Sequence, residues 1–265
     1  MKRIESRSNP LIVNTGKLTE RKHRLASGKF FFEGAHLMEE YLRFGFVPET
    51  VFVCDGAEQK YAALLSRIPE ERLCSVPAFV FEKLSTEQAP QGLLTVSAFL
   101  PCVKTVSDGT ELDGKILFLE SVRDNGNVGT VIRTAAALGW NCVLSPDCAD
   151  VYASKTVRAT MGTLFSGCVS VCKESVSFVT ALRANGRRVF GAALGEHQLL
   201  LGSFALQNDD CFIVGNEGQG ISRELLSLCD NAVLIPMTAK AESLNASIAA
   251  SVIMWEGARN DLRRE

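Results

Sequence analysis

Three polar loops, each placed directly after a predicted strand, carry the side chains of this sequence that are best suited to chemistry. The first contains Asn127 and Arg133 at the start of a predicted helix, and the second carries Glu217 within a glycine-rich turn. The third has Ser243 and Asn245 just ahead of the last predicted helix. A guanidinium can bind phosphate and stabilise developing negative charge, and amide or carboxylate groups can hold it in place. We therefore place the candidate site in these loops.

The glycine-rich turn is suited to holding a ligand by its backbone. Gly215, Gly218 and Gly220 follow a buried strand and precede a predicted helix, so backbone amides there can approach a ligand closely. Their order, G-x-x-G-x-G, differs from the dinucleotide-binding G-x-G-x-x-G, and Ile235 stands where a ribose-binding carboxylate belongs. The chain also lacks a G-x-x-x-x-G-K-[ST] sequence. These patterns disfavour an NAD-binding enzyme and a P-loop enzyme.

Each loop also has an ordinary structural interpretation when it is taken alone. Asn127 can cap a helix that begins near it, and Arg133 can be a surface or ion-paired arginine. Glu217 can be an exposed turn residue, and Ser243 or Asn245 can cap the final helix. Considered singly, the loops leave both interpretations open.

Cysteine and histidine usage argues against a metal site. The nine cysteines are odd in number, none forms a C-x-x-C pair, and most lie in apolar segments, which is typical of reduced, buried thiols. The three histidines lie far apart in the sequence and near no ligand pattern. We expect no metal.

The charge distribution is uneven along the chain. The formal net charge is −2, which by itself argues against nucleic acid, yet residues 1–30 hold eight Lys or Arg and two Glu, a local charge of +6. Such a segment can neutralise phosphates, with Arg21, Lys22 and Arg24 as candidates. The alternative is a solvated, partly frayed basic arm, and the segment alone does not decide between them.

Length and hydropathy predict a folded protein of two α/β domains. The 265 residues are 46% apolar and 22% charged, with a mean hydropathy of +0.11. No stretch approaches a membrane span and no apolar signal core follows Met1, so we expect a soluble cytoplasmic protein. The pattern predicts a small α/β domain over residues 1–100, with helices at 35–44, 57–68 and 77–84 and strands at 50–54, 73–76 and 93–100. Residues 101–114 have the composition of a linker.

A second α/β domain is predicted over residues 115–265. Strands that are apolar throughout alternate with helices, a pattern that indicates a mainly parallel sheet covered on both faces. The predicted strands are 115–122, 141–145, 168–172, 187–194, 211–214 and 232–236, and the predicted helices are 128–138, 153–161, 175–184, 222–229 and 245–259. Ligands of such sheets bind at the carboxyl ends of the strands, where the three loops lie.

Together and in this order, the loops resemble the motifs of the SpoU/TrmH family of SPOUT RNA ribose 2′-O-methyltransferases. The matching segments are NVGTVIRTA at 127–135, GNEGQG at 215–220, IPM at 235–237 and SLNAS at 243–247, with SKTVRATMGTLF at 154–165 between them. In the first half, SNPLIVNTGKL at 8–18, FFEG at 31–34 and APQGLLTV at 89–96 are similar to the family's RNA substrate-binding domain. One departure is Asn125, where many relatives have proline, a change that mainly affects turn stiffness.

The resemblance implies an S-adenosylmethionine cofactor bound in a trefoil-knotted carboxyl-terminal domain. Gly215, Ile235 and Leu244 would contact the cofactor, largely through backbone groups. The implied reaction is methyl transfer to a ribose 2′-hydroxyl, with Asn127, Glu217, Ser243 and Asn245 as supporting polar residues around Arg133. A guanidinium is a poor base, so we expect Arg133 to hold the adjacent phosphate instead.

The resemblance also implies partners and leaves alternatives. It implies a homodimer acting on RNA, and ribosomal RNA is preferred because relatives with the extra amino-terminal domain mostly act there. The alternatives are a tRNA ribose 2′-O-methyltransferase and a catalytically silent RNA-binding protein of the same fold. The presence of Asn127, Arg133, Glu217, Ser243 and Asn245 disfavours the silent protein.

Overall fold

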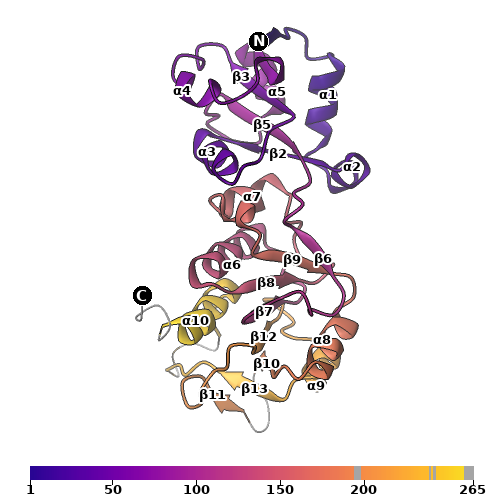
Figure 1. Cartoon of the computed structure of the whole chain (residues 1–265), viewed down its shortest axis with the longest axis vertical. Coiled ribbons are helices and arrows are strands. Elements are labelled where there is room, and N and C mark those ends of the chain that lie inside the picture. The colour runs from indigo at the N-terminus through magenta and orange to yellow at the C-terminus, as the bar shows by residue number, and fades with distance from the viewer. Residues whose placement is uncertain (194–197, 239, 241–242, 260–265) are drawn as a thin grey trace. The chain divides into compact units, whose positions relative to one another are not determined.

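The computed structural model describes residues 1–193, 198–238, 240 and 243–259 (Figure 1). By their contacts, Met1–Pro101 and Asp150–Phe165 form a first unit, and Cys102–Ala149 and Ser166–Glu265 form a second.

The segment Asp150–Phe165 lies in the first unit, although the sequence pattern groups it with the second domain. Its aromatic side chains explain this placement. The Tyr152 ring stacks on Phe99 with 4.2 Å between ring centroids, and Phe165 lies 5.4 Å from Phe32. The order of residues along the chain does not reveal these contacts between distant segments.

The first unit contains a five-stranded mixed sheet. Its strand order is β1-β4-β3-β5-β2, in which β5 is antiparallel to both neighbours and the other pairs are parallel. The strands are β1 (Lys2–Arg3), β2 (Lys29–Glu33), β3 (Thr50–Cys54), β4 (Leu73–Val76) and β5 (Leu93–Ala98). The helices are α1 (Pro10–Lys17), α2 (Arg21–Ser27), α3 (Ala35–Arg43), α4 (Ala62–Leu65), α5 (Ala78–Leu84) and α7 (Ser154–Ala159).

The basic amino-terminal segment is folded, so the alternative of a frayed arm is wrong. It forms β1, α1, α2 and the start of β2. Pro10 occupies the first turn of α1, and the Asn9 side chain caps this helix by accepting from the amide of Leu11 at 2.9 Å. The prediction of a helix over 57–68 is also corrected, because only Ala62–Leu65 is α-helical there.

The second unit contains an eight-stranded sheet in which every pair is parallel, as the sequence predicts. The strand order is β11-β13-β10-β12-β7-β8-β9-β6. The strands are β6 (Lys104–Val106), β7 (Ile116–Leu119), β8 (Asn141–Leu144), β9 (Val169–Cys172), β10 (Val189–Ala192), β11 (Leu199–Leu200), β12 (Cys211–Val214) and β13 (Asn231–Leu234). Strand β6 lies within the predicted linker, where three residues are too short a run to show a period.

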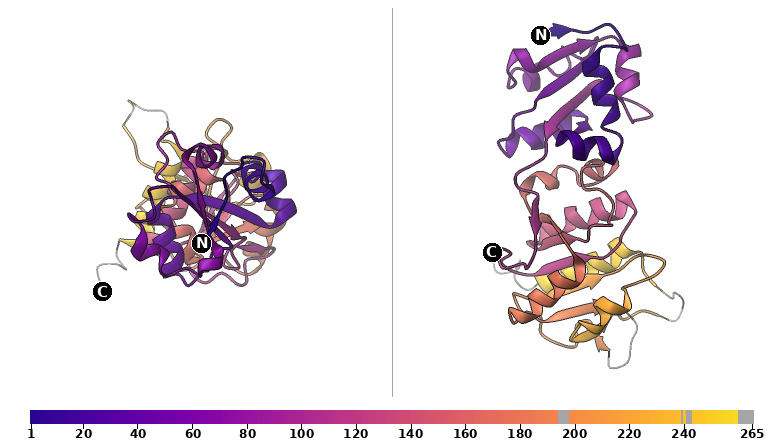
Figure 2. Two further views of the ribbon diagram at one scale, coloured as in Figure 1. Left: turned by 90° about the horizontal axis from the view of Figure 1, so that it is seen from above. Right: turned by 90° about the vertical axis from the view of Figure 1, so that its right-hand side faces the viewer.

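Helices cover both faces of this sheet. Helices α6 (Asn125–Leu138) and α10 (Ala246–Ala258) lie side by side on one face, and α8 (Ser175–Ala184) and α9 (Arg223–Ser227) lie on the other (Figures 1 and 2). All four residues of β7 and all four of β12 are buried. Phe118 of β7 packs into a cluster with Phe178 of α8 and Leu225 of α9. Burial of each such side chain stabilises the fold by about 1.5–3 kcal/mol, which keeps the strand ends in place.

Candidate functional site at the carboxyl ends of the strands

The three predicted loops converge at one edge of the second sheet. Strands β13, β10, β12 and β7 are consecutive neighbours and all parallel, so their carboxyl ends lie at the same edge. The first loop follows β7, the second follows β12, and the third follows β13. The sheet therefore brings the loop after Leu119 to the same edge as the loops after Val214 and Leu234.

The first and second loops are joined by a hydrogen bond between two predicted site residues. The Asn127 amide Nδ2 donates to Glu217 Oε1 at 2.6 Å. Asn127 is not the cap of α6, which corrects that interpretation. Asp124 is the cap, and its carboxylate accepts from the Asn127 backbone amide at 2.8 Å. Because Asp124 performs the capping, the Asn127 side chain is available to Glu217.

Gly215 allows the second loop to close on itself. A Cβ at this position would lie 2.2 Å from the backbone carbon of Gly220 and 2.4 Å from the amide nitrogen of Ile221. The loop is held by paired backbone hydrogen bonds between Asn216 and Gly220, at 3.0 and 2.8 Å. Only glycine leaves room for this closure.

Asn216, which the sequence analysis did not single out, fixes the loop from within. Its Oδ1 accepts from the amides of Gly218 and Gln219 at 2.9 and 3.1 Å, and its Nδ2 donates to the Ser121 carbonyl at 2.8 Å. The position of Asn216 inside the GNEGQG motif is a signal that could have found it. Asn216 thereby ties the loop after β12 to the loop after β7.

Ser121 is a strained residue that was also missed. Its φ of 55° lies in the left-handed region, which non-glycine residues rarely adopt. Its amide donates to Ser145 Oγ at 2.9 Å, and its hydroxyl donates to Asp147. Although burial alone would raise it, hydrogen bonds from Ser121 and Ser145 lower the pKa of Asp147, so this acceptor stays ionised. These bonds hold the strained backbone at the site.

The third loop lines a hollow of about 200 Å³. This loop contributes Ile235, Ser243 and Leu244, three of the predicted site residues, and Met237 to the wall of the hollow. The remaining walls come from the ends of β10 and β13 and the start of α10, at Ala192, Ala193, Val233, Leu234 and Ala249. The hollow is thus mostly apolar, with backbone groups at the strand ends.

Asn245 caps the final helix, as the structural interpretation predicts. Its Oδ1 accepts from the amides of Ser247 and Ile248, at 2.9 and 3.4 Å, and from the Ser247 hydroxyl at 2.7 Å. Ser243 lies two residues before it and is exposed. Asn245 therefore holds the start of α10 beside the hollow, whatever else its amide contacts.

Within the described residues, Arg133 makes no hydrogen bond or ion pair with the other predicted catalytic residues. It is exposed on α6, and within the described part of the chain its guanidinium has no ion pair or hydrogen bond. The next residue, Thr134, contacts Ser251 of α10 through hydroxyls 3.3 Å apart. Arg133 therefore lies on the helix that contacts α10, next to a residue that makes this contact.

The predicted RNA-contacting residues of the first unit separate into two groups. Arg21 and Lys22 are exposed, and Lys22 pairs with Glu20 at 2.8 Å. Arg24 is only 4% exposed and forms an ion pair with Asp150 at 2.5 Å. Its guanidinium also donates to the carbonyls of Leu18 and Thr19. Arg24 is thus engaged inside the unit, which corrects its prediction as a phosphate ligand.

The cysteines behave as small apolar residues. All nine are free thiols, and five are buried. Burial raises the pKa of Cys172 to about 11 and that of Cys229 to about 12, so both stay protonated near neutral pH. Within the residues that the structure describes, no group of three His, Cys, Asp or Glu side chains is arranged to hold a metal.

Among the described helices, none has both the length and the apolar composition needed to cross a bilayer.

The chain is similar over almost its whole length to known proteins. The family model described as "SpoU rRNA Methylase family" matches residues 114–255, and the "MRM3-like substrate binding domain" model matches residues 9–95. The chain is 30% identical to the Bacillus subtilis 23S rRNA (guanosine(2553)-2′-O)-methyltransferase RlmP, over 96% of this chain and 98% of that protein. It is also 30% identical to a 23S rRNA (uridine(2479)-2′-O)-methyltransferase of Streptomyces viridochromogenes, over 97% and 92% of the two chains. An AdoMet-bound rRNA methyltransferase from Sinorhizobium meliloti superposes with a TM-score of 0.84 at 26% identity, covering 98% of each chain.

Proposed function

The chain belongs to the SpoU rRNA methylase family, and from this premise we propose that it transfers the methyl group of S-adenosylmethionine to a ribose 2′-hydroxyl of ribosomal RNA. The observation that carries the proposal is the contact of Asn127 in the first motif with Glu217 in the second, 90 residues apart, at the carboxyl edge of a parallel sheet. Such edges are where ligands bind in α/β folds.

The hollow beside the third loop suits the adenosine part of the cofactor. Apolar side chains such as Ile235 and Leu244 can enclose a flat ring, while backbone groups at the strand ends can hydrogen-bond its polar edge. Gly215 would act by keeping the neighbouring loop closed. When bound, the cofactor supplies an electrophilic methyl group on a sulfonium. We further propose that this domain is trefoil-knotted, because its match to the SpoU methylase family implies that fold.

The residues of the chain would act by alignment and charge stabilisation. Arg133 would bind the phosphate next to the target ribose and stabilise the negative charge that develops on the 2′-oxygen. The hydroxyl proton would pass to water as the oxygen–methyl bond forms and the sulfonium–methyl bond breaks, which would leave the cofactor as a neutral thioether. Asn127, held by Glu217, orients the ribose.

We propose that the active form is a homodimer that uses the exposed face of α10. Ile248, Val252 and Trp255 follow a helical spacing on this face and are 50%, 36% and 51% exposed. Such an exposed apolar stripe is typical of an interface. It also lies on the helix that contacts α6, which carries Arg133.

Replacing Trp255 with glutamate is therefore expected to produce monomers, because a buried, unpaired carboxylate opposes association. Sedimentation velocity measures the outcome. Leu25→Glu is a matched control, since Leu25 is 62% exposed on α2 in the first unit. A dimer that persists in Trp255→Glu, or a monomeric wild type, would remove this interface.

The first unit would bind the RNA, with residues 1–100 as the substrate-binding domain and residues 115–265 as the methyltransferase domain. Lys17, His23 and Lys29 line a groove of about 420 Å³ that α1 and α2 form with the sheet. Arg21 and Lys22 lie on the same basic segment. Lysine and arginine side chains grouped in this way bind RNA phosphates. Because the proposed substrate is ribosomal RNA, we also propose that the protein acts in the cytoplasm.

Two substitutions separate RNA contact from folding in the basic segment. Lys22→Ala is expected to lower the salt dependence of RNA binding. The slope of the logarithm of the binding constant against the logarithm of the salt concentration should fall by about one for each phosphate contact that is lost. Arg24→Ala is expected to lower the free energy of unfolding by about 3 kcal/mol, because it leaves Asp150 without its partner. Salt titrations of RNA binding and chemical denaturation measure the two effects. An Arg24→Ala protein of wild-type stability, or an unchanged slope in Lys22→Ala, would contradict the assignment concerned.

A pair of substitutions tests whether Asn245 does more than cap α10. Asn245→Asp retains a capping oxygen, whereas Asn245→Ala loses about 1 kcal/mol of stability. We expect Asn245→Asp to unfold like the wild type but to lose methyl transfer by at least about tenfold, as an amide donor is removed from a polar site. Wild-type transfer by Asn245→Asp would show that Asn245 serves the helix alone.

Mapping of 2′-O-methylated nucleotides tests the proposed function directly. RNA from cells with and without the gene should differ at one ribosomal nucleotide, and the purified protein should restore that methyl group with S-adenosylmethionine. A difference confined to tRNA would select the tRNA enzyme. Binding of rRNA without methyl transfer would select the catalytically silent protein.

A further inference from the structure

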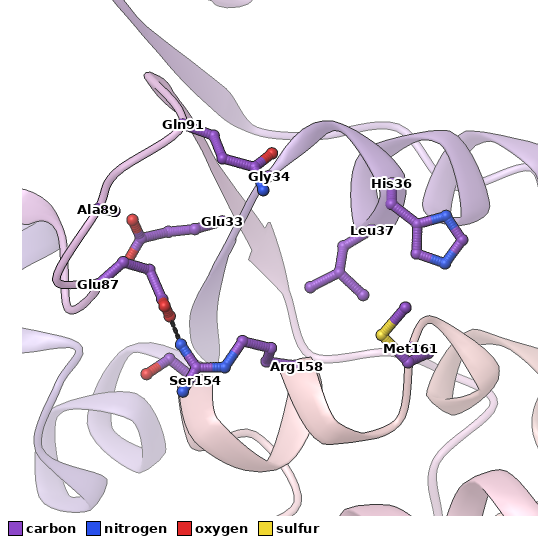
Figure 3. Close-up of a pocket in the computed structure, with 10 residues that line it drawn as sticks. All are labelled: Glu33, Gly34, His36, Leu37, Glu87, Ala89, Gln91, Ser154, Arg158 and Met161. Atoms are coloured by element: carbon purple, nitrogen blue, oxygen red, sulfur yellow. Dashed lines mark ion pairs between the residues drawn. The ribbon is translucent and has the colours of Figure 1, made fainter.

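Another cavity lies within the first unit, whereas the proposed methyl-transfer residues belong to the second unit. It measures about 240 Å³ and brings together residues 33–37, the loop at 87–91 and the segment 154–161 (Figure 3). The first two stretches fall within the match to the substrate-binding domain model, and the third within the match to the methylase model. Nothing in the proposed mechanism uses this cavity.

The cavity has an apolar wall with a cation beside it. Leu37 and Met161 supply the wall, and Met161 remains 41% exposed while its φ of 52° lies in the left-handed region. The Arg158 side chain pairs with Glu87 and is 49% exposed, so it retains an open face. Figure 3 shows Met161 with His36 on one side of the cavity and Glu33 with Glu87 on the other. A planar guanidinium next to apolar groups is a surface on which an aromatic ring can stack.

The polar side of the cavity presents fixed hydrogen-bonding groups. The Glu33 carboxylate accepts from the Ser85 hydroxyl at 2.5 Å and from the amide and hydroxyl of Thr86 at 2.8 and 3.0 Å. A carboxylate has about four acceptor positions, so one remains for another donor. The Gln91 amide lies over Gly34, whose missing Cβ would come 3.2 Å from Gln91 Oε1. Within the described chain, that side-chain amide has no hydrogen-bond partner.

Charge and size limit the class of ligand. Two carboxylates, of Glu33 and Glu87, face one guanidinium, of Arg158, so the cavity does not favour a phosphate. Its volume lies below the roughly 300 Å³ at which pockets for larger ligands begin, which favours a single flat ring. Unpaired RNA bases are recognised by stacking on arginine planes and by hydrogen bonds to their edges. The cavity combines both features.

We propose that this cavity holds one unpaired nucleobase of the RNA substrate, stacked against Arg158 and Met161 and hydrogen-bonded at its edge by Gln91 and Glu33. The inference rests on the proposed function, because it assumes that the ligand of the first unit is RNA. It adds a base-reading site to a unit otherwise assigned phosphate contacts.

Methyl NMR on the full-length protein labelled at the methionine methyl groups tests this proposal. The probes are the four ribonucleoside 5′-monophosphates, with ribose 5-phosphate as the control that has no base. A base stacked beside Met161 shifts its methyl signal by ring current, and Met161→Ala assigns that signal. We expect at least one mononucleotide to shift the Met161 signal and ribose 5-phosphate to leave it in place. An unmoved signal with all four, or an equal shift with ribose 5-phosphate, overturns the proposal.

A matched pair of variants adds specificity to the measurement. Gln91→Ala is expected to weaken the mononucleotide response at Met161 at least fivefold. Gln88→Ala, an exposed residue of the same loop that does not line the cavity, should leave it unchanged. Equal responses in the two variants would remove Gln91 from the site and overturn the proposed hydrogen bonding.

The same spectra separate this proposal from the proposed function. Met237 lines the hollow assigned to the cofactor, so S-adenosylmethionine should shift the Met237 signal and leave Met161 unmoved. A Met237 signal that S-adenosylmethionine does not shift would count against the methyltransferase. A Met161 signal that none of the mononucleotides shifts would count against the base pocket alone.

Discussion

Replacing Arg133 with lysine is expected to lower kcat for methyl transfer by at least about 100-fold, the loss typical of removing a group that stabilises developing charge. Lysine keeps the positive charge but loses the planar, two-pronged donor geometry with which arginine holds a phosphate. In the described chain Arg133 is exposed and has no ion pair, so the substitution removes no internal contact of the fold. The dissociation constant for S-adenosylmethionine and the unfolding temperature should therefore stay near wild type.

Single-turnover transfer to rRNA, with cofactor binding measured separately, provides the readout for Arg133→Lys. Arg223→Lys serves as the matched control, because Arg223 is an exposed arginine on α9, on the other face of the sheet. Near-wild-type turnover in Arg133→Lys would exclude both a phosphate clamp and a base at this position. A large loss in Arg223→Lys as well would indicate a general effect of arginine on RNA binding.

Gly215→Ala is expected to have the second large effect, on stability and activity together. The added Cβ would meet the backbone of Gly220 and Ile221 at 2.2–2.4 Å, and backbone atoms cannot rotate away as a side chain can. We expect the free energy of unfolding to fall by about 2 kcal/mol, as in other overpacked sites. Because the loop also carries Glu217, its displacement should cost about 100-fold in methyl transfer, the order expected for a misplacement near 1 Å.

A control for Gly215→Ala lies in the same loop. A Cβ at Gly218 would meet only the Asn216 Oδ1 at 3.5 Å, an ordinary contact. Gly218→Ala should therefore keep most of the stability and activity. Denaturant unfolding and methyl transfer, measured for both variants, test whether the closed loop is needed for stability and activity. Equal behaviour of the two alanine variants would show that closure of this loop is not needed for the site.

Local sequence patterns were sufficient for much of the second unit. The unbroken apolar character of strands such as β7 and β12 predicted a parallel sheet, and this prediction is confirmed. The polar loops after strands predicted a site at one edge, because carboxyl ends of parallel strands meet there. The contact between Asn127 and Glu217 agrees with that expectation. Their roles in catalysis stay predictions.

Other features could not be predicted from neighbours in the sequence. Asp124, and not Asn127, caps α6, since either residue type is a good cap and the choice depends on what else each side chain contacts. The sequence does not distinguish the basic residues of the segment 1–30 from one another. The structure does, because Arg24 is buried against Asp150, 126 residues away.

Local patterns predicted most of the strands, helices and polar loops of this chain, because hydrophobic periodicity and turn residues act over a few neighbouring positions. The tertiary structure alone decided which distant segments share an environment. It placed Asp150–Phe165 in the first unit and assembled the cavity beside Arg158 from three separate stretches of the chain. The physical reason is that burial and ion pairing depend on contacts between residues far apart in the chain, which a local pattern of residue types does not encode.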